Sequence, residues 1–162
     1  MPVPTWKTVV LGNRRSIAAL REALEAAGMA IGDLAGLALD RLTVAAEPVQ
    51  VDLVVRSAVE LGITSEDTNL AEVAERARAF GLALCPAEVG PQLRLQYPDQ
   101  PLGEFLRIAM RPIVTEQGTV GITVGNGGAG LLLIGNNSHP DRPLAAILQF
   151  VFVRSDSQER RL

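Results

Sequence analysis

The stretch Thr119-Val-Gly-Ile-Thr-Val-Gly-Asn-Gly-Gly-Ala-Gly-Leu-Leu-Leu-Ile134 contains two strand-like runs on either side of a glycine-rich loop. β-Branched residues dominate the run 119–124, and the run 131–134 is wholly apolar, which is typical of β-strands. Between the two runs, Asn-Gly and Gly-Gly pairs supply the positive φ angles that a tight hairpin uses. The sequence therefore predicts a β-hairpin here.

The loop of this hairpin also matches the pattern G-x-G-x-x-G over Gly125–Gly130. That pattern binds the pyrophosphate of a dinucleotide when a helix begins at the loop. Here the run 131–134 is followed at once by Gly-Asn-Asn-Ser, which leaves no room for a helix of about ten residues. We therefore interpret the pattern as a hairpin loop and expect no cofactor.

Outward from the hairpin, the second half of the chain is typical of strands and the first half mostly of helices, which indicates an α+β fold. Helices are predicted over 16–27, 33–42 and 70–80, the last with a capping box of Asn69 and Glu72. Further strands are predicted over 6–11, 51–56, 93–97, 106–111 and 150–153. The expectation is an antiparallel or mixed sheet of about five to seven strands.

These elements are expected to form a single α+β domain over residues 1–155, followed by a polar tail over 156–162. The two main helices, Ser16–Ala27 and Leu70–Phe80, are expected to cover one face of the sheet. The expected core contains Trp6, Leu20, Leu24, Val51, Leu53, Val55, Val73, Phe80, Leu95, Ile108 and Phe152.

The composition limits the classes of function. With 15 Lys and Arg against 18 Asp and Glu among 162 residues, the chain lacks the basic excess that sequence-independent nucleic-acid binding requires. A helix-turn-helix over 16–42 is disfavoured because its second helix offers mainly Ala, Leu and two acids to a base edge. We therefore expect no nucleic-acid partner.

Location and metal chemistry follow from the same counts. The longest apolar runs, such as 131–134 and 144–148, are far shorter than the ~20 residues of a membrane-spanning helix. The first residues do not match a secretory signal, so a soluble, cytoplasmic protein without a membrane partner is expected. The single Cys and single His exclude a disulfide framework and metal sites rich in these residues.

Nucleophilic catalysis would depend on Cys85 and His139, the sole residues of their types. Nothing near Cys85 in the sequence lowers the pKa of a thiol, and we expect it to be partly buried. His139 lies in a polar loop before Pro140 and is expected to face solvent. We therefore assign no catalytic, cofactor-binding or metal-binding residue.

The predicted strands 93–97 and 106–111 give the most informative candidate site. If they form a hairpin with Leu95 opposite Leu106, Arg94 lies opposite Arg107, and like charges in that position are unfavourable unless a negative group sits between them. That group is either a carboxylate from the acidic first half, or an anionic ligand or acidic partner. The candidate anion-binding or partner-binding residues are Arg94, Gln96, Arg107 and Arg111.

The charge distribution makes both explanations reasonable. Residues 1–90 carry 12 acidic and 8 basic side chains, whereas residues 91–162 carry 6 acidic and 7 basic ones. A carboxylate from the first half is therefore the first explanation to test for the Arg-bearing strands.

The central block Leu84-Cys-Pro-Ala-Glu-Val-Gly-Pro-Gln-Leu-Arg-Leu-Gln-Tyr97, with Asp99-Gln100-Pro101 and Gly103-Glu104, resembles a block of an uncharacterised bacterial protein family. The resemblance implies membership and no activity. In similar proteins the C-terminal segment has more Trp, Tyr and Asp, whereas it is rich in Gly and Leu here. The order of elements is also similar to the C-type-lectin-like fold, whose first and last strands pair, and such a fold is often a binding scaffold.

Three functions remain open. The leading hypothesis is a non-enzymatic binding or interaction module, which uses the Arg-bearing strands or the loops of 125–140 to bind an unknown protein or a small anionic ligand. The second is a small enzyme that uses Glu88, Asp99 or Glu104. The third is an obligate homo-oligomer whose interface is formed by 131–134 and 144–150.

Overall fold

The computed structural model describes residues 3–139 and 141–156, and the predicted tail lies almost wholly outside them. The helices of this part are α1 (Ile17–Ala26), α2 (Asp33–Leu39), α3 (Leu70–Arg78) and α4 (Val89–Gln96). Its strands are β1 (Lys7–Leu11), β2 (Ala30–Ile31), β3 (Val49–Ser57), β4 (Asp67–Thr68), β5 (Leu82–Ala83), β6 (Phe105–Ile108), β7 (Ile113–Thr115), β8 (Gly118–Gly127), β9 (Gly130–Asn137), β10 (Leu144–Ala145) and β11 (Gln149–Arg154).

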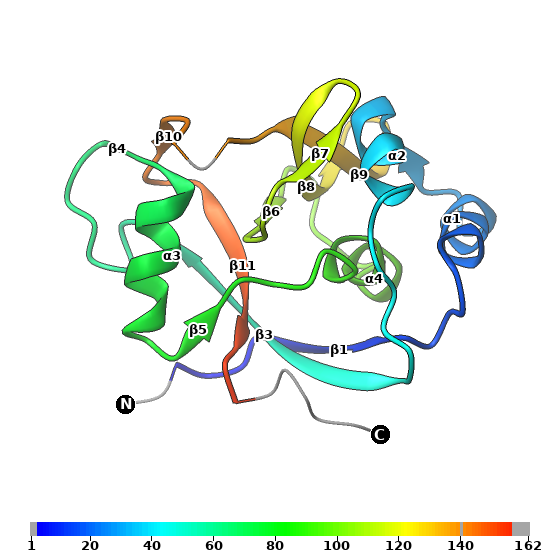
Figure 1. Ribbon diagram of the computed structural model, residues 1–162, viewed down its shortest axis with the longest axis horizontal. Coiled ribbons are helices and arrows are strands. Elements are labelled where there is room, and N and C mark those ends of the chain that lie inside the picture. Colours follow the sequence, from blue (N-terminus) through cyan, green and yellow to red (C-terminus); the bar gives the residue numbers. More distant parts are fainter. Residues whose placement is uncertain (1–2, 140, 157–162) are drawn as a thin grey trace.

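One mixed sheet organises the molecule (Figure 1). Its strands follow the order β1-β3-β11-β6-β8-β9-β2, and β5 and β7 add short pairings to β11 and β8. The pairs β11–β6 and β2–β9 are parallel, and the others are antiparallel. The predicted α+β class with a mixed sheet is confirmed. The seven strands of the main path match the predicted number, and the two short strands raise the total to nine.

The predicted hairpin is the β8–β9 pair, whose register runs from Val120 opposite Asn137 to Gly127 opposite Gly130. The positive φ that the turn requires falls on Gly130, at +104°. Because β9 begins at this same glycine, no helix starts at the loop. The interpretation of G-x-G-x-x-G as a hairpin loop is therefore confirmed.

Side-chain caps begin the two longest helices, and the one at Asn69 was predicted. The Ser16 side chain accepts a hydrogen bond from the Ala19 amide at the start of α1. The Asn69 side chain accepts one from the Glu72 amide at the start of α3. Each cap satisfies an amide that has no partner within its helix, which explains why both helices begin where the sequence predicts.

The two main helices were expected to cover the same face of the sheet. In the structure they cover opposite faces. Leu20 and Leu24 of α1 share a buried cluster with Leu53 of β3, whereas Val73 of α3 shares a second cluster with Val54. Consecutive residues of a strand point to opposite faces, so Leu53 and Val54 mark the two sides of β3. Each face of the sheet therefore carries its own buried apolar cluster, and each cluster includes residues of one of the two helices.

Residues 93–96 form the second half of the buried helix α4 and Tyr97 is its C-cap, so this segment is not a strand, which corrects the prediction. Leu and polar residues alternate over these five positions, but the alternation does not reflect a half-buried strand. Every residue from Val89 to Arg94 is buried, so α4 has no exposed polar side from which a surface helix can be recognised. The predicted hairpin between 93–97 and 106–111 therefore does not exist, and β6 pairs with β11 and β8 instead.

Most of the predicted core is buried, with four exceptions. Leu20, Leu24, Val51, Leu53, Val73, Ile108 and Phe152 are at most 3% exposed. Trp6 and Phe80 are 37% and 42% exposed, and Val55 and Leu95 are half-buried. Trp6 lies at the edge of the core, where its ring packs edge-on against Tyr97 with the ring centroids 5.2 Å apart.

The first and last strands along the chain, β1 and β11, do not pair with each other as they do in the C-type-lectin-like fold. The strand β3 lies between β1 and β11 and pairs with both. Among the described residues, no helix is long and apolar enough to cross a membrane.

Candidate functional site

The central block of the sequence forms a buried polar network around α4, which lies between β1 and the β8–β9 hairpin (Figure 1). Glu88 immediately precedes the helix and is 1% exposed. Its carboxylate accepts hydrogen bonds from the Gly12 amide at 2.7 Å and the Ala45 amide at 2.8 Å. The Gln92 side chain donates to the same carboxylate and to Asn13. Glu88 therefore fixes two loops of the first half to α4.

Gln96 uses both ends of its amide to cover the edge strand β1. Its Oε1 accepts from the Val10 amide, and its Nε2 donates to the Val10 carbonyl, each at 2.9 Å. Because β1 is the first strand of the sheet order, these backbone groups have no further strand to pair with. Gln96 therefore acts as a structural group and does not offer a free amide to a ligand.

Arg94 is fully buried and is solvated by oxygen atoms of the protein. Its Nη1 donates to Gln100 Oε1 at 2.6 Å and to the Gly125 carbonyl at 2.8 Å, and its Nη2 donates to the Tyr97 carbonyl at 2.7 Å. Burial lowers the pKa of Arg94, while Tyr97 and Glu104 raise it. The guanidinium thus joins α4 to the hairpin and is not accessible to an external anion.

The network continues from Gln100 to a carboxylate. Gln100 Nε2 and the Tyr97 hydroxyl both donate to Glu104 Oε1, at 3.1 and 2.8 Å. Burial, with the hydrogen bond and negative charge of Glu104, raises the pKa of Tyr97 to about 12. Nearly all polar groups of the central block are therefore engaged in holding the fold together.

Arg107 lies on the opposite face of the sheet from α4. Its neighbours on β6, Leu106 and Ile108, share the buried cluster of α4, so alternation turns Arg107 away from it. Cross-strand pairing places Arg107 beside Thr123 and then Ile134, and Phe105 beside Gly125 and then Leu132. We call this surface the open sheet face; it consists of Phe105, Arg107, Thr123, Leu132 and Ile134, none of which is fully buried.

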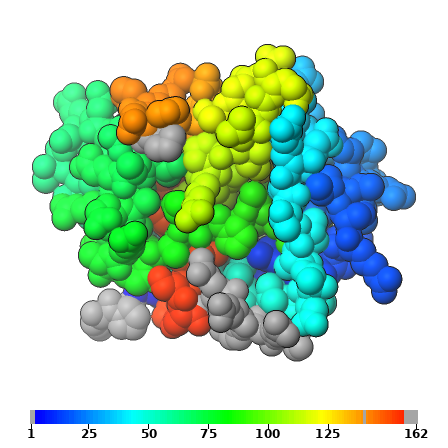
Figure 2. Space-filling model, in the orientation of Figure 1, coloured from blue at the N-terminus to red at the C-terminus, as the bar shows by residue number. Residues whose placement is uncertain are grey.

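The charge of Arg107 has no counter-charge in the described part of the chain. No ion pair or side-chain hydrogen bond joins Arg107 to residues 3–139 or 141–156. Burial lowers the pKa of Arg107, and the positive charge of Arg142 lowers it further. The segment 141–148, orange in Figure 2, contains Arg142 and lies beside the yellow-green β7–β8 region. Two cations therefore repel each other at the open sheet face.

The structure thus separates the candidates Arg94, Gln96, Arg107 and Arg111. The first two are structural, Arg107 lies on the open sheet face, and Arg111 is exposed beside a cleft near α3. The interaction of Arg107 with Arg142 was missed because 35 positions separate them in the sequence and no pattern joins them.

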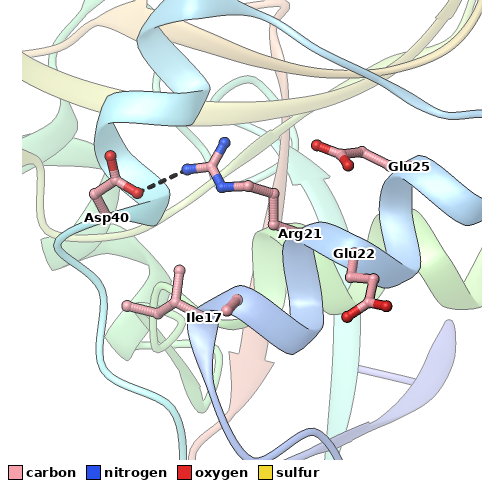
Figure 3. Close-up of a pocket in the computed structure, with 6 residues that line it drawn as sticks. Ile17, Arg21, Glu22, Glu25 and Asp40 are labelled. Carbon is pink, nitrogen blue, oxygen red and sulfur yellow. Dashed lines mark hydrogen bonds and ion pairs between the residues drawn. The ribbon is translucent and has the colours of Figure 1, made fainter.

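The acidic first half does not supply the carboxylate that the sequence suggested for the Arg-bearing strands. In a groove of about 420 Å³ between α1 and α2, Arg21 donates to Asp40 at 2.8 Å (Figure 3). Glu22 and Glu25 line the same groove. These acids are therefore placed around a basic residue of their own half. An ion pair between Arg41 and Glu116 does link the two halves, but its base comes from the first half and its acid from the second.

The carboxylates of the enzyme hypothesis do not converge. Glu88 is bound to backbone amides, Glu104 is bound to Tyr97 and Gln100, and Asp99 is exposed. Glu88 precedes α4 and Tyr97 follows it, which separates the two networks by roughly 13 Å along the helix axis. This geometry therefore does not favour general acid–base catalysis in which Glu88 and Glu104 act as a pair.

Cys85 and His139 do not form a nucleophile and base. The Cys85 thiol is buried, donates to the Val151 carbonyl at 3.3 Å, and has its pKa raised by burial. His139 is exposed, and its Nδ1 accepts from the Asp141 amide. Among the described residues, no group of three or more His, Cys, Asp and Glu could hold a metal ion.

No protein-family model, no curated protein and no solved structure matches the chain. The function of the protein therefore has to be inferred from the chemistry of its surface.

Proposed function

We propose that this protein is a non-enzymatic binding module whose open sheet face binds an acidic, partly apolar segment of a partner protein. The proposal is carried by Arg107, a half-buried guanidinium without a counter-charge in the described residues. A partly desolvated cation is unfavourable until an anion reaches it. A carboxylate suits this position, because a guanidinium binds it through two parallel hydrogen bonds.

The rest of the open sheet face supports a ligand that is also apolar. Phe105 is 45% exposed, and Leu132 and Ile134 are half-buried on the same face. Gly125 lies among them without a side chain, and the Phe105 ring occupies the space where its Cβ would be. Apolar side chains next to an Arg are typical of the centre of protein–protein interfaces.

A second copy of the chain fits this face less well. The homo-oligomer hypothesis places an interface on 131–134 and 144–150, and part of that region, Leu132 and Ile134, does belong to the open sheet face. In a two-fold dimer the same patch meets itself, so Arg107 and Arg142 of one copy would face the same residues of the other. Such like-charge contact favours an acidic partner over self-association.

The experiment is a peptide-display selection from a random library against the full chain. The wild-type protein is expected to enrich peptides in which Asp or Glu adjoins Leu, Ile or Phe. The double variant R107E/R142E is expected to lose that enrichment, because the charges that select the acids are reversed. Binding of an enriched peptide should also weaken as salt is raised, since the cations are partly exposed.

The matched control is R14E/R15E, which makes the same change of net charge at two exposed residues before α1. It should enrich the same acidic peptides as the wild type. Selection without acidic enrichment, or equal enrichment on the R107E/R142E variant, contradicts the proposal.

We further propose that the protein acts in the cytoplasm. The proposal is supported by its buried, unpaired Cys85, a state that a reducing compartment maintains. Fractionation of cells that express the protein tests the location, and recovery in a membrane or secreted fraction contradicts it.

A further inference from the structure

We propose a second binding site, for a small apolar monocarboxylate, in the cleft between α3 and the segment that joins β5 to α4. The cleft has a volume of about 500 Å³, within the range of small-molecule sites in proteins. It is separate from the open sheet face, with which it shares no residue.

The walls of the cleft are mostly small and apolar. Ala74 from α3 and the segment 83–87, Ala-Leu-Cys-Pro-Ala, line it. The Cys85 thiol donates to a buried carbonyl and has its pKa raised, so it contributes an inert surface. A hydrocarbon chain or ring gains free energy when it leaves water for such a surface.

Two arginines from different elements complete the lining. Arg78 lies at the end of α3, and Arg111 follows β6. Arg78 forms an ion pair with Glu75 of its own helix at 3.4 Å, and both side chains are about three-quarters exposed. An exposed pair of this kind is weak, so Arg78 can turn toward the cleft. Arg111 has no ion pair with the residues that the structure describes.

The charges at this rim favour a single negative charge in the ligand. Arg78 and Arg111 are positive and Glu75 is negative, which leaves a net charge of +1. A monocarboxylate neutralises this charge and presents two oxygens to a guanidinium, with its apolar part in the cleft. A phosphate dianion would leave excess negative charge beside Glu75 and would leave the apolar walls uncovered.

The experiment titrates the isotope-labelled full chain with 4-phenylbutyrate, and with the neutral amide 4-phenylbutyramide, while amide NMR signals are recorded. The acid is expected to shift the signals of Ala74, Ala83 and Ala87. The amide should bind about tenfold more weakly, as loss of one charged hydrogen bond implies. The variant Arg111→Ala should lower affinity for the acid by about the same factor.

Two further variants separate the site from a general effect. Arg15→Ala removes an exposed arginine elsewhere and should leave the affinity unchanged. Ala74→Phe fills the cleft from the half-buried surface of α3 and should abolish binding. Equal binding of acid and amide, an unchanged affinity in Arg111→Ala, or displacement of the acid by an equal concentration of inorganic phosphate overturns the assignment.

Discussion

Arg94 and Arg107 show how two arginines of one small protein can have opposite roles. Arg94 donates to three backbone carbonyls and to Gln100 in the interior, so its removal leaves buried acceptors without donors. Arg107 donates to no side chain of the described residues and lies beside another cation. One residue is therefore expected to serve stability and the other to serve binding.

We predict that Arg94→Met lowers the free energy of unfolding by about 3–4 kcal/mol, because several buried oxygens lose their hydrogen bonds. The matched variant Arg107→Met should change it by less than about 0.5 kcal/mol or stabilise the protein, since the repulsion by Arg142 is removed. Urea unfolding followed by the fluorescence of Trp6, the sole tryptophan, measures both values. Equal losses in the two variants contradict the separation of roles.

The residues of the candidate site could be found from the sequence only in part. The sequence identified Arg94 and Arg107 because the predicted hairpin placed these two cations opposite each other. The structure shows that the repulsion is real for Arg107 but comes from Arg142. A guanidinium that donates to carbonyls leaves no signal in the sequence, because every residue carries a carbonyl.

Among the elements, the helix α2 is packed unusually closely on β9. A Cβ atom added to Gly135 would lie 2.5 Å from Leu34 Cβ and 2.6 Å from the Ala35 nitrogen. Backbone atoms at this distance cannot move without moving the helix. The close approach places α2 over part of β9. The strand β2 pairs with only two residues of β9.

We predict that Gly135→Ala lowers the free energy of unfolding by about 2–3 kcal/mol, because α2 must shift away from the sheet. Gly128→Ala is the control, since nothing lies within 4 Å of the added Cβ and its φ is not positive. It should be neutral or slightly stabilising. Thermal unfolding of the two variants tests the pair, and a neutral Gly135→Ala contradicts the packing of α2.

At this scale, elements with local signals were predicted well. The caps Ser16 and Asn69 mark the starts of α1 and α3, and the glycine-rich loop marks the β8–β9 turn. The helix α4 was predicted wrongly, because its state is decided by burial on all sides and by partners such as Val10, 86 positions away. A pattern within five residues contains no information about such partners.

For the molecule as a whole, the fold class followed from the order of helical and strand-like segments, but the assignment of helices to faces did not. Helix placement depends on which side of β3 each helix reaches, and both faces of the sheet carry a buried apolar cluster. The free energy of unfolding also contains a contribution from the weakly acidic side chains of Tyr97 and Cys85. Their burial is determined only by the three-dimensional arrangement.

We predict that the free energy of unfolding decreases as the pH rises from about 10 to 12. The pKa of Tyr97 is raised by burial and by Glu104 to about 12, so the unfolded chain loses this proton first and is stabilised above its ordinary pKa near 10. The Cys85 thiol, whose pKa burial raises, acts in the same direction. Urea unfolding at a series of alkaline pH values measures the decrease, and Tyr97→Phe should make it smaller. An identical pH dependence in Tyr97→Phe contradicts the assignment.

The cover that Gln96 gives to β1 has a consequence for synthesis of the chain. Val10 leaves the ribosome 86 residues before the side chain that satisfies its amide and carbonyl. At roughly 5–20 residues per second, this interval lasts about 4–17 s. During that time the nascent strand presents a bare edge to other chains. A delay of translation between residues 11 and 96 would therefore lengthen the period in which the protein is most prone to aggregate.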